Sequence, residues 1–161
     1  MAENLLISGI TKEEKYESLL PQIKALIATE KNPTANLGNI ASAIKYGLGV
    51  FWVGFYFVEN DELVLGPFQG TVACTRIKFG KGVCGMAWKR KTTIIVDDVE
   101  KFPGHIACSS LSKSEIVVPG IDESGKVIFV MDLDATEFAR FDATDQKYLQ
   151  EICEISVGIL R

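Results

Sequence analysis

Three of the four cysteines in this chain of 161 residues lie close to glycines, in segments where a thiol can meet other molecules. Cys74 and Cys84 flank a stretch that leads into Gly80 and Gly82, and Cys108 ends the run FPGHIAC. Core filler needs no such setting, whereas a reactive thiol must be reachable. A thiolate can be oxidised to a sulfenic acid that a second cysteine captures as a disulfide. This placement indicates thiol redox chemistry.

Two other roles for these cysteines stay open. Free cysteine is often buried filler, which is the role we expect for Cys153 inside an apolar helical pattern. A zinc site made of three cysteines and His105 is the other alternative, but no closely spaced CxxC pair occurs, so no metal is expected. His105, the only histidine, is interpreted as an ordinary loop residue, with tuning of the Cys108 thiol as the alternative.

Three carboxylates are placed unusually in apolar surroundings. Glu115 directly precedes the apolar run 116–119, and Asp132 and Asp134 interrupt another apolar stretch. Residues two apart on a strand point to the same face, so the two aspartates should share one face. Strand interiors normally exclude Asp, and a solvated face is the simpler explanation for one carboxylate. Two on one face predict a polar pocket wall that holds an ammonium group or supplies a proton.

Two aromatic residues, Trp52 and Tyr56, lie four apart on the first expected strand and should also share a face. Most aromatic side chains belong to the core, but one or two could line a small apolar or sulfur-binding pocket. The glycine-rich segment 80–85 does not match a phosphate-binding loop. Its glycines are interpreted as allowing tight turns beside Cys84.

The composition fits one ordinary globular domain and excludes several classes of function. The chain is 47% hydrophobic, with a net charge of −4. An acidic chain is a poor candidate for nucleic-acid binding, and no apolar run is long enough for a membrane span. We see no signal peptide at residues 1–10 and therefore expect reduced thiols in the cytoplasm.

Hydrophobic periodicity predicts helices at both ends of the chain and a strand-rich middle. The first helix is expected to begin after Thr11, with Glu14 in a capping box and Pro21 as a kink or break. A long irregular segment, 97–112, suggests a functional loop. We expect helices at 12–31, 34–46, 83–90 and 142–160, and strands at 50–58, 62–68, 92–96, 114–119 and 127–133. This order predicts an α+β sandwich whose antiparallel central sheet is flanked by the N- and C-terminal helices.

The chain strongly resembles the free methionine-(R)-sulfoxide reductases, a family built on a GAF domain. The resemblance runs from about residue 10 to the end, and it implies a single GAF-like catalytic domain over 1–161. The runs FPGHIAC and SEIVVP together are specific, whereas a GAF fold alone would say little about activity. The matching stretches are 52–56, 65–70, 74–85, 102–108, 114–119 and 131–134.

The resemblance implies an enzyme that reduces free L-methionine (R)-S-oxide to L-methionine. Cys108 matches the nucleophile that becomes a sulfenic acid, and Cys74 and Cys84 match the other two family cysteines. One of these two should form the intramolecular disulfide, with Cys74 favoured and Cys84 as an alternative or relay. No bound cofactor is implied. Thioredoxin would be the reductant, and it would receive its electrons from NADPH through thioredoxin reductase. The oligomeric state is open, a homodimer included.

The pocket residues follow from the same resemblance. Glu115, Asp132 and Asp134 match the family's pocket carboxylates, and Trp52 matches a substrate-pocket aromatic. A sulfoxide sulfur becomes electrophilic once its oxygen accepts a proton, so a thiolate and an acid are needed on opposite sides. Glu115 is the natural acid for Cys108, while the aspartates could be acids or ammonium ligands. A closed pocket suits a free amino acid and excludes a peptide.

Departures from the family pattern leave the thiols and the main carboxylates intact. Ser109 follows Cys108 where Asp is usual, which puts a local charge effect on the Cys108 thiolate in doubt. Phe51 replaces the usual Asn, and residues 131, 133 and 135 differ from the commoner run. The alternative function is a GAF module that senses a small ligand, with cysteines as core or as a redox switch. Tight binding of a cyclic nucleotide without sulfoxide turnover would favour it.

Overall fold

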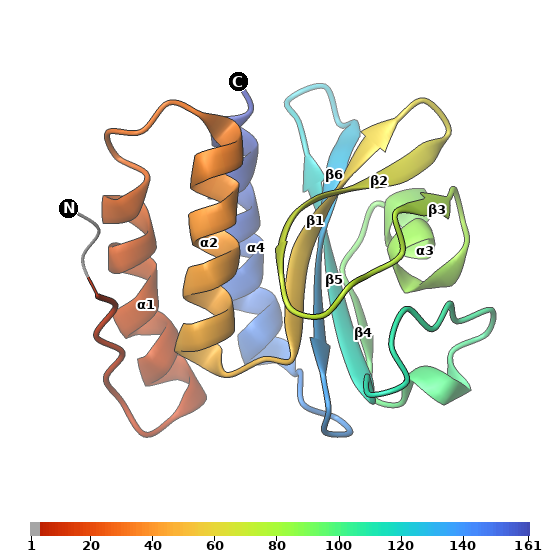
Figure 1. Ribbon diagram of the computed structural model, residues 1–161, viewed down its shortest axis with the longest axis horizontal. Coiled ribbons are helices and arrows are strands. Elements are labelled where there is room, and N and C mark those ends of the chain that lie inside the picture. Colours follow the sequence, from red (N-terminus) through yellow and green to blue (C-terminus); the bar gives the residue numbers. More distant parts are fainter. Residues whose placement is uncertain (1–3) are drawn as a thin grey trace.

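The computed structural model describes residues 4–161 as a six-stranded sheet with helices on both faces (Figure 1). The expected domain over 1–161 includes residues 1–3, which lie outside the described part. In chain order the elements are α1 (Lys12–Leu26), α2 (Pro33–Leu48), β1 (Trp52–Glu59), β2 (Glu62–Gln69), β3 (Arg76–Lys78), α3 (Gly82–Arg90), β4 (Ile94–Val96), the 3-10 helix η1 (Val99–Lys101), β5 (Ser114–Ile121), β6 (Val127–Ala135) and α4 (Ala143–Ile159).

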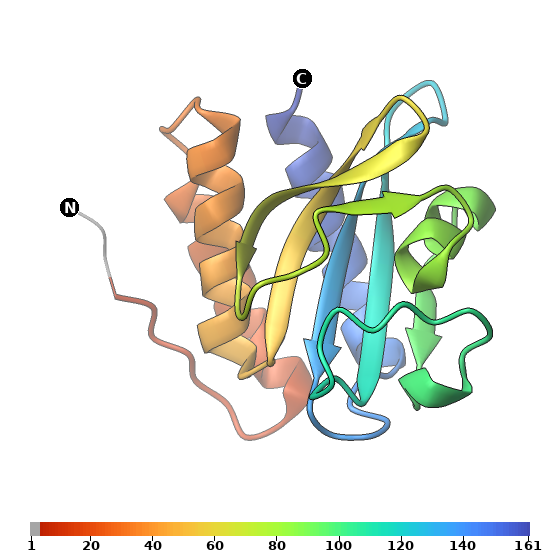
Figure 2. The same ribbon diagram turned by 45° about the vertical axis from the view of Figure 1, so that its right-hand side comes forward.

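The strands are ordered β3-β2-β1-β6-β5-β4, and every neighbouring pair is antiparallel. Helices α1, α2 and α4 cover one face of the sheet (Figure 1). Helix α3 and the loop between η1 and β5 lie on the other side (Figure 2). The sheet therefore has one face for a helical core and another for a site.

The helix ends follow from local capping. The Thr11 side chain accepts the Glu14 N–H, and the Glu14 carboxylate accepts the Thr11 N–H, which completes the expected capping box. Asn32 caps α2, and Gly49 ends it in a left-handed conformation. Asp142 caps α4 with a second capping box.

The first helix differs from its expected course. It passes through Pro21 without a break, and it ends at Leu26 instead of Lys31. The chain must turn before α2, and the Glu30 carboxylate holds that turn by accepting the N–H groups of Lys31 and Asn32 at 2.7 Å each. These local hydrogen bonds compete with continuation of the helix.

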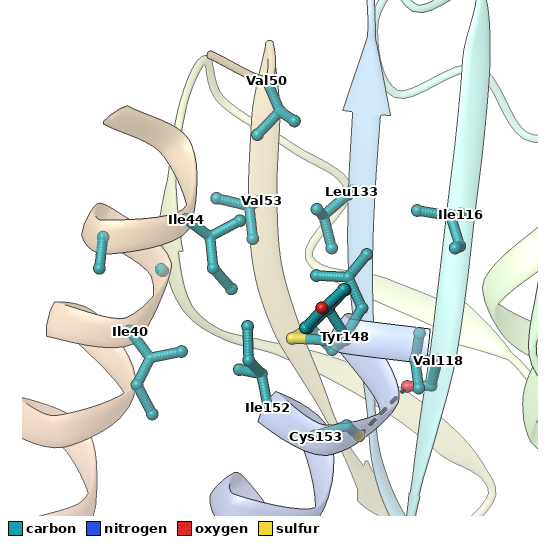
Figure 3. Close-up of a cluster of buried hydrophobic side chains, with 14 of the residues drawn as sticks. Ile40, Ile44, Val50, Val53, Ile116, Val118, Leu133, Tyr148, Ile152 and Cys153 are labelled. Carbon is teal, nitrogen blue, oxygen red and sulfur yellow. Dashed lines mark hydrogen bonds between the residues drawn. The ribbon is translucent and has the colours of Figure 1, made fainter. Parts of the chain in front are cut away.

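Apolar side chains form one cluster on each face of the sheet. The larger cluster lies between the sheet and the helices α1, α2 and α4, and Figure 3 shows its members pointing toward one another, among them Ile40, Ile44, Val53, Leu133 and Ile152. Full burial of such a side chain contributes roughly 1.5–3 kcal/mol. Cys153 belongs to this cluster, as expected, and its thiol donates to the Val118 carbonyl.

The smaller cluster packs α3 against the opposite face of the sheet and includes Trp52, Tyr56 and Cys84. Strand β3 was missed by the sequence analysis because it has only three residues and one buried side chain, Ile77. The segment 97–112 is irregular, as expected, apart from η1. Over the described residues, no helix combines the length and the hydropathy needed to cross a membrane.

Candidate active site

A pocket that is open to solvent lies on the sheet face that α3 covers. Of the eight residues expected in the site, seven line the pocket, namely Trp52, Tyr56, Cys84, Cys108, Glu115, Asp132 and Asp134. The eighth, Cys74, is joined to the pocket through Cys108.

The three carboxyl groups come together through strand register. Glu115 on β5 lies directly opposite Asp134 on β6, and Asp132 lies two residues further along β6. Residues directly opposite each other on paired antiparallel strands point to the same face, and so do residues two apart on one strand. The three side chains therefore lie on one face of the sheet. The shared face predicted for the two aspartates is therefore present, and Glu115 lies within β5.

Burial shapes the protonation of this cluster. It is the main cause that raises the pKa of Glu115 and of Asp132 well above the usual range, and nearby carboxylates add to the rise. Burial also raises the pKa of Asp134 to about 6, with Ser112 partly opposing the rise. Within residues 4–161, no lysine or arginine nitrogen lies within 4.0 Å of these carboxylates. The cluster can therefore hold a proton near neutral pH.

Asp132 has a further property that points to a ligand. The residue is 6% exposed, and its Oδ1 atom has no hydrogen-bond partner among the described residues. A buried acceptor without a partner costs about 1–3 kcal/mol. A donor group on a bound molecule would remove this cost.

Two stacked aromatic rings of β1, Trp52 and Tyr56, line the pocket. Trp52 stacks on Tyr56 and on Phe68, with ring centroids 6.1 and 5.4 Å apart. The Trp52 indole donates to the Thr71 carbonyl at 3.0 Å, and the Tyr56 hydroxyl donates to the Cys74 carbonyl at 2.9 Å. Tyr56 thus ties the pocket wall to the backbone of a site cysteine.

The cysteines occupy two different environments. Cys74 and Cys108 are linked by a disulfide that spans 34 residues of sequence, and Cys108 lies in an exposed loop. Cys84 is buried in the first turn of α3, with its sulfur 4.0 Å from Glu115 Oε1. Burial and the neighbouring carboxylates Asp132 and Glu115 raise the pKa of the Cys84 thiol well above its usual value. Cys84 is therefore protonated near neutral pH.

The metal site considered from the sequence is not assembled, since Cys74 and Cys108 are bonded to each other. Cys84, Glu115 and Asp132 could offer three ligand atoms within 4.8 Å of one another.

Sequence reasoning missed the contribution of several loop residues. Phe51, Ser112 and the segment 71–73 line the pocket, and His105 lies against Glu115 with 3.9 Å between Nε2 and Oε2. No periodic pattern marks irregular segments, so the only signal was the length of the 97–112 loop.

The GAF domain family matches residues 36–156, and the chain belongs to it. This agrees with the α+β class and the GAF-like fold expected from the sequence. Among curated relatives, "GAF domain-containing protein A" of Dictyostelium discoideum is 56% identical over 156 residues, which are 96% of this chain and 98% of that protein.

Within the GAF domains, the chain belongs to the free methionine-R-sulfoxide reductase family. The free methionine-R-sulfoxide reductase of Saccharomyces cerevisiae is 44% identical over 156 residues, with 92% of this chain and 87% of that protein covered. The X-ray structure of the Neisseria meningitidis reductase in complex with its substrate has a TM-score of 0.94 and 50% identity, covering 97% of this chain and 94% of that one. The expected family, and with it the class of enzyme, is confirmed.

Proposed function

We propose that this chain reduces free L-methionine (R)-S-oxide to L-methionine through a Cys108 sulfenic acid and the Cys74–Cys108 disulfide. One observation carries the proposal. One pocket holds two buried carboxyl groups, Glu115 and Asp132, and the half-buried Asp134, without a lysine or arginine partner in the described chain, and the exposed Cys108 that lines it is paired with a second cysteine. Family membership supports the same reaction.

The carboxyl cluster suits the ammonium group of a free amino acid. The unpartnered Oδ1 of Asp132 is an acceptor for an ammonium N–H, and Asp134 lies on the same face two residues away. Trp52 and Tyr56 offer an apolar wall on which the methylene and methyl groups of the methionine sulfoxide side chain can pack. A peptide-bound residue has no free ammonium group, so the carboxyl cluster would discriminate against it.

The chemistry divides between Cys108 and Glu115. Glu115 gives its proton to the sulfoxide oxygen while the Cys108 thiolate attacks the sulfur. The hydroxyl group of this adduct then passes from the substrate sulfur to the Cys108 sulfur as the new sulfur–sulfur bond breaks, which releases methionine and leaves Cys108 as a sulfenic acid. The Cys74 thiolate then attacks the Cys108 sulfur, and the oxygen departs as water. Two thiols and one sulfoxide thus become one disulfide, methionine and water.

Cys74 is favoured over Cys84 as the cysteine that resolves the sulfenic acid. The attacking group must be a thiolate, and the pKa of the Cys84 thiol is raised by burial and by its carboxylate neighbours. Cys74 is half-buried and already pairs with Cys108. Cys84 instead contacts Glu115 inside the pocket.

Reduction of the disulfide after each turnover requires an external dithiol. We propose that this dithiol is thioredoxin, which itself receives electrons from NADPH through thioredoxin reductase. Thiol–disulfide exchange needs a reachable sulfur, and the exposed position of Cys108 supports such access. A cycle that depends on reduced thioredoxin fits the cytoplasm, where thiols are kept reduced.

The test is NADPH consumption with thioredoxin and thioredoxin reductase on separate R and S epimers, free and peptide-bound. We expect turnover of the free R epimer alone. Cys108→Ser should abolish it. Cys74→Ser should release about one methionine per chain and then stop, because the sulfenic acid cannot be resolved. Cys153→Ala, far from the site in the helical core, is the matched cysteine control and should keep turnover.

Wild-type protein that consumes no NADPH with the free R epimer would overturn the proposal. Binding of a cyclic nucleotide in the same sample would then favour the ligand-sensing alternative. Equal activity on a peptide-bound residue would contradict the role of the carboxyl cluster.

A further inference from the structure

The only histidine of the chain reaches into the pocket from the loop that carries Cys108. His105 Nε2 lies 3.9 Å from Glu115 Oε2, and the His105 side chain is 16% exposed against 8% for Glu115. The His105 backbone N–H donates to the Phe102 carbonyl at 3.1 Å, which fixes the loop beside the pocket. His105 therefore touches both the buried acid and the solvent.

Glu115 faces an electrostatic problem once it has given up its proton. The resulting carboxylate would be buried next to Asp132 and Asp134, and a buried charge without a counter-charge is costly. Within the described chain, His105 is the one basic side chain within 4.0 Å of Glu115. Cys84, on the other side of Glu115, is a protonated thiol and supplies no positive charge.

We propose that His105 is the positioning residue that delivers protons to Glu115. This rests on the proposed function, because it requires Glu115 to protonate the sulfoxide oxygen. His105 takes one proton from solvent, stabilises the Glu115 carboxylate as an ion pair, and then passes that proton to it. The proton that Cys108 loses on forming its thiolate goes to solvent, so the count over one turnover balances.

The distance suits a relay more than a permanent bond. At 3.9 Å the pair is longer than a direct hydrogen bond, and a rotation of the imidazole or one bridging water closes the gap. Burial lowers the pKa of His105, with Glu100 of η1 acting in the opposite direction. A neutral imidazole that takes and releases a proton near neutral pH is the expected result.

The groups around the pair come from four elements. Glu100 faces His105 from η1, and Glu115 faces it from β5. Behind Glu115 lie Cys84 on α3 and the two aspartates on β6. All are acidic groups or a thiol, so removal of His105 leaves Glu115 with no basic neighbour in the described chain.

The test measures methionine formed over repeated turnovers, with substrate in excess and saturating reduced thioredoxin, between pH 6 and 9, because Glu115 begins the first turnover protonated and needs the relay only afterwards. We expect His105→Ala and His105→Gln to react about 10-fold more slowly, below the full effect of a direct acid. Added imidazole should restore His105→Ala but not His105→Gln, whose side chain fills the space. Ser110→Ala, an exposed change in the same loop outside the pocket lining, should behave as wild type.

The outcomes separate the two proposals. An inactive wild type rejects the proposed function. An active wild type with unchanged His105→Ala rates rejects only the relay. If the His105→Ala variant reacts slowly and imidazole does not raise its rate, His105 has a structural role and the relay is overturned. A His105→Gln variant with the full wild-type rate and pH profile leads to the same conclusion. Mass spectrometry of the Cys74–Cys108 crosslink shows whether each variant still seats its loop.

Discussion

At the scale of single residues, the carboxyl cluster lowers the stability of the fold while it provides acceptors for a ligand. Glu115, Asp132 and Asp134 share one buried face, and burial raises the pKa of each. Such groups bind protons more tightly when folded than when unfolded, so their ionisation near neutral pH opposes folding. A ligand with an ammonium group would relieve this cost, as expected of a binding site.

Asp134 provides a pH-dependent test of this cost. Its folded pKa of about 6 lies above the usual value of 3.8 for an aspartate side chain. Between pH 4 and 6 the unfolded chain loses the proton while the folded chain keeps it, so stability falls as pH rises through this window. Asp134→Asn should remove the part of this fall that Asp134 contributes, while Glu115 and Asp132 keep theirs, and should gain on the order of 1–3 kcal/mol over wild type between pH 4 and 7. Urea unfolding at both pH values measures it, and parallel pH dependences would contradict it.

Residue spacing predicted part of this cluster and could not predict the rest. The two-residue period of a strand placed Asp132 and Asp134 on one face, as found. Their meeting with Glu115 depends on the register between β5 and β6, which spacing along one strand does not encode. The contact between His105 and Glu115 depends on loop geometry and was missed for the same reason.

At the scale of elements, β1 can carry two stacked aromatic rings because a glycine, Gly54, lies between Trp52 and Tyr56 on the strand. A Cβ atom at Gly54 would lie 2.4 Å from Trp52 Cη2 and 2.6 Å from Phe68 Cβ. Gly54 shares its strand face with Trp52 and Tyr56, and the missing side chain leaves room for the Trp52 ring.

Gly54→Ala should therefore displace Trp52 and damage the pocket. We expect KM for the free sulfoxide to rise about 10-fold, because the apolar wall is lost, and overpacking to cost roughly 1–3 kcal/mol. Gly38→Ala on α2 is the matched control, since nothing lies within 4 Å of its Cβ position. It should keep KM and add about 0.5–1 kcal/mol of stability. Equal KM values for Gly54→Ala and wild type would show that the position of Trp52 is unimportant.

The elements were predictable where their pattern is long and capped. Thr11 and Asp142 mark helix starts that agree with the structure. Strand β3 is short and lies at the sheet edge, so tertiary pairing with β2 decides it and local pattern does not. The end of α1 was set by the Glu30 turn, a feature that helical periodicity alone does not reveal.

At the scale of the whole molecule, the sheet separates the stabilising core from the chemistry. Helices α1, α2 and α4 pack on one face (Figure 1), and the residues that line the pocket lie on the other. Each face has its own apolar cluster. Changes among the terminal helices should therefore alter the free energy of unfolding without altering substrate binding.

Two polar ties between α1 and α4 test this separation. Asp145 is 1% exposed and accepts the Tyr16 hydroxyl at 2.8 Å and a Lys12 ammonium N–H. Asp145→Ala leaves the buried Tyr16 hydroxyl without its acceptor and removes one of the three acceptors of the Lys12 ammonium group, so it should cost about 3 kcal/mol. The Lys24–Glu151 pair is about half exposed at both ends, so Lys24→Ala should cost less than about 1 kcal/mol.

Both substitutions should leave kcat/KM for free L-methionine (R)-S-oxide unchanged at temperatures where the variants stay folded, because neither residue lines the pocket. Chemical denaturation gives the two stability costs, and the coupled NADPH assay gives the kinetics. Should Asp145→Ala fail to fold, Tyr16→Phe removes only the hydroxyl and should cost about 1 kcal/mol. A folded Asp145→Ala or Tyr16→Phe protein with an altered KM would show that the helical layer and the pocket are coupled through the sheet.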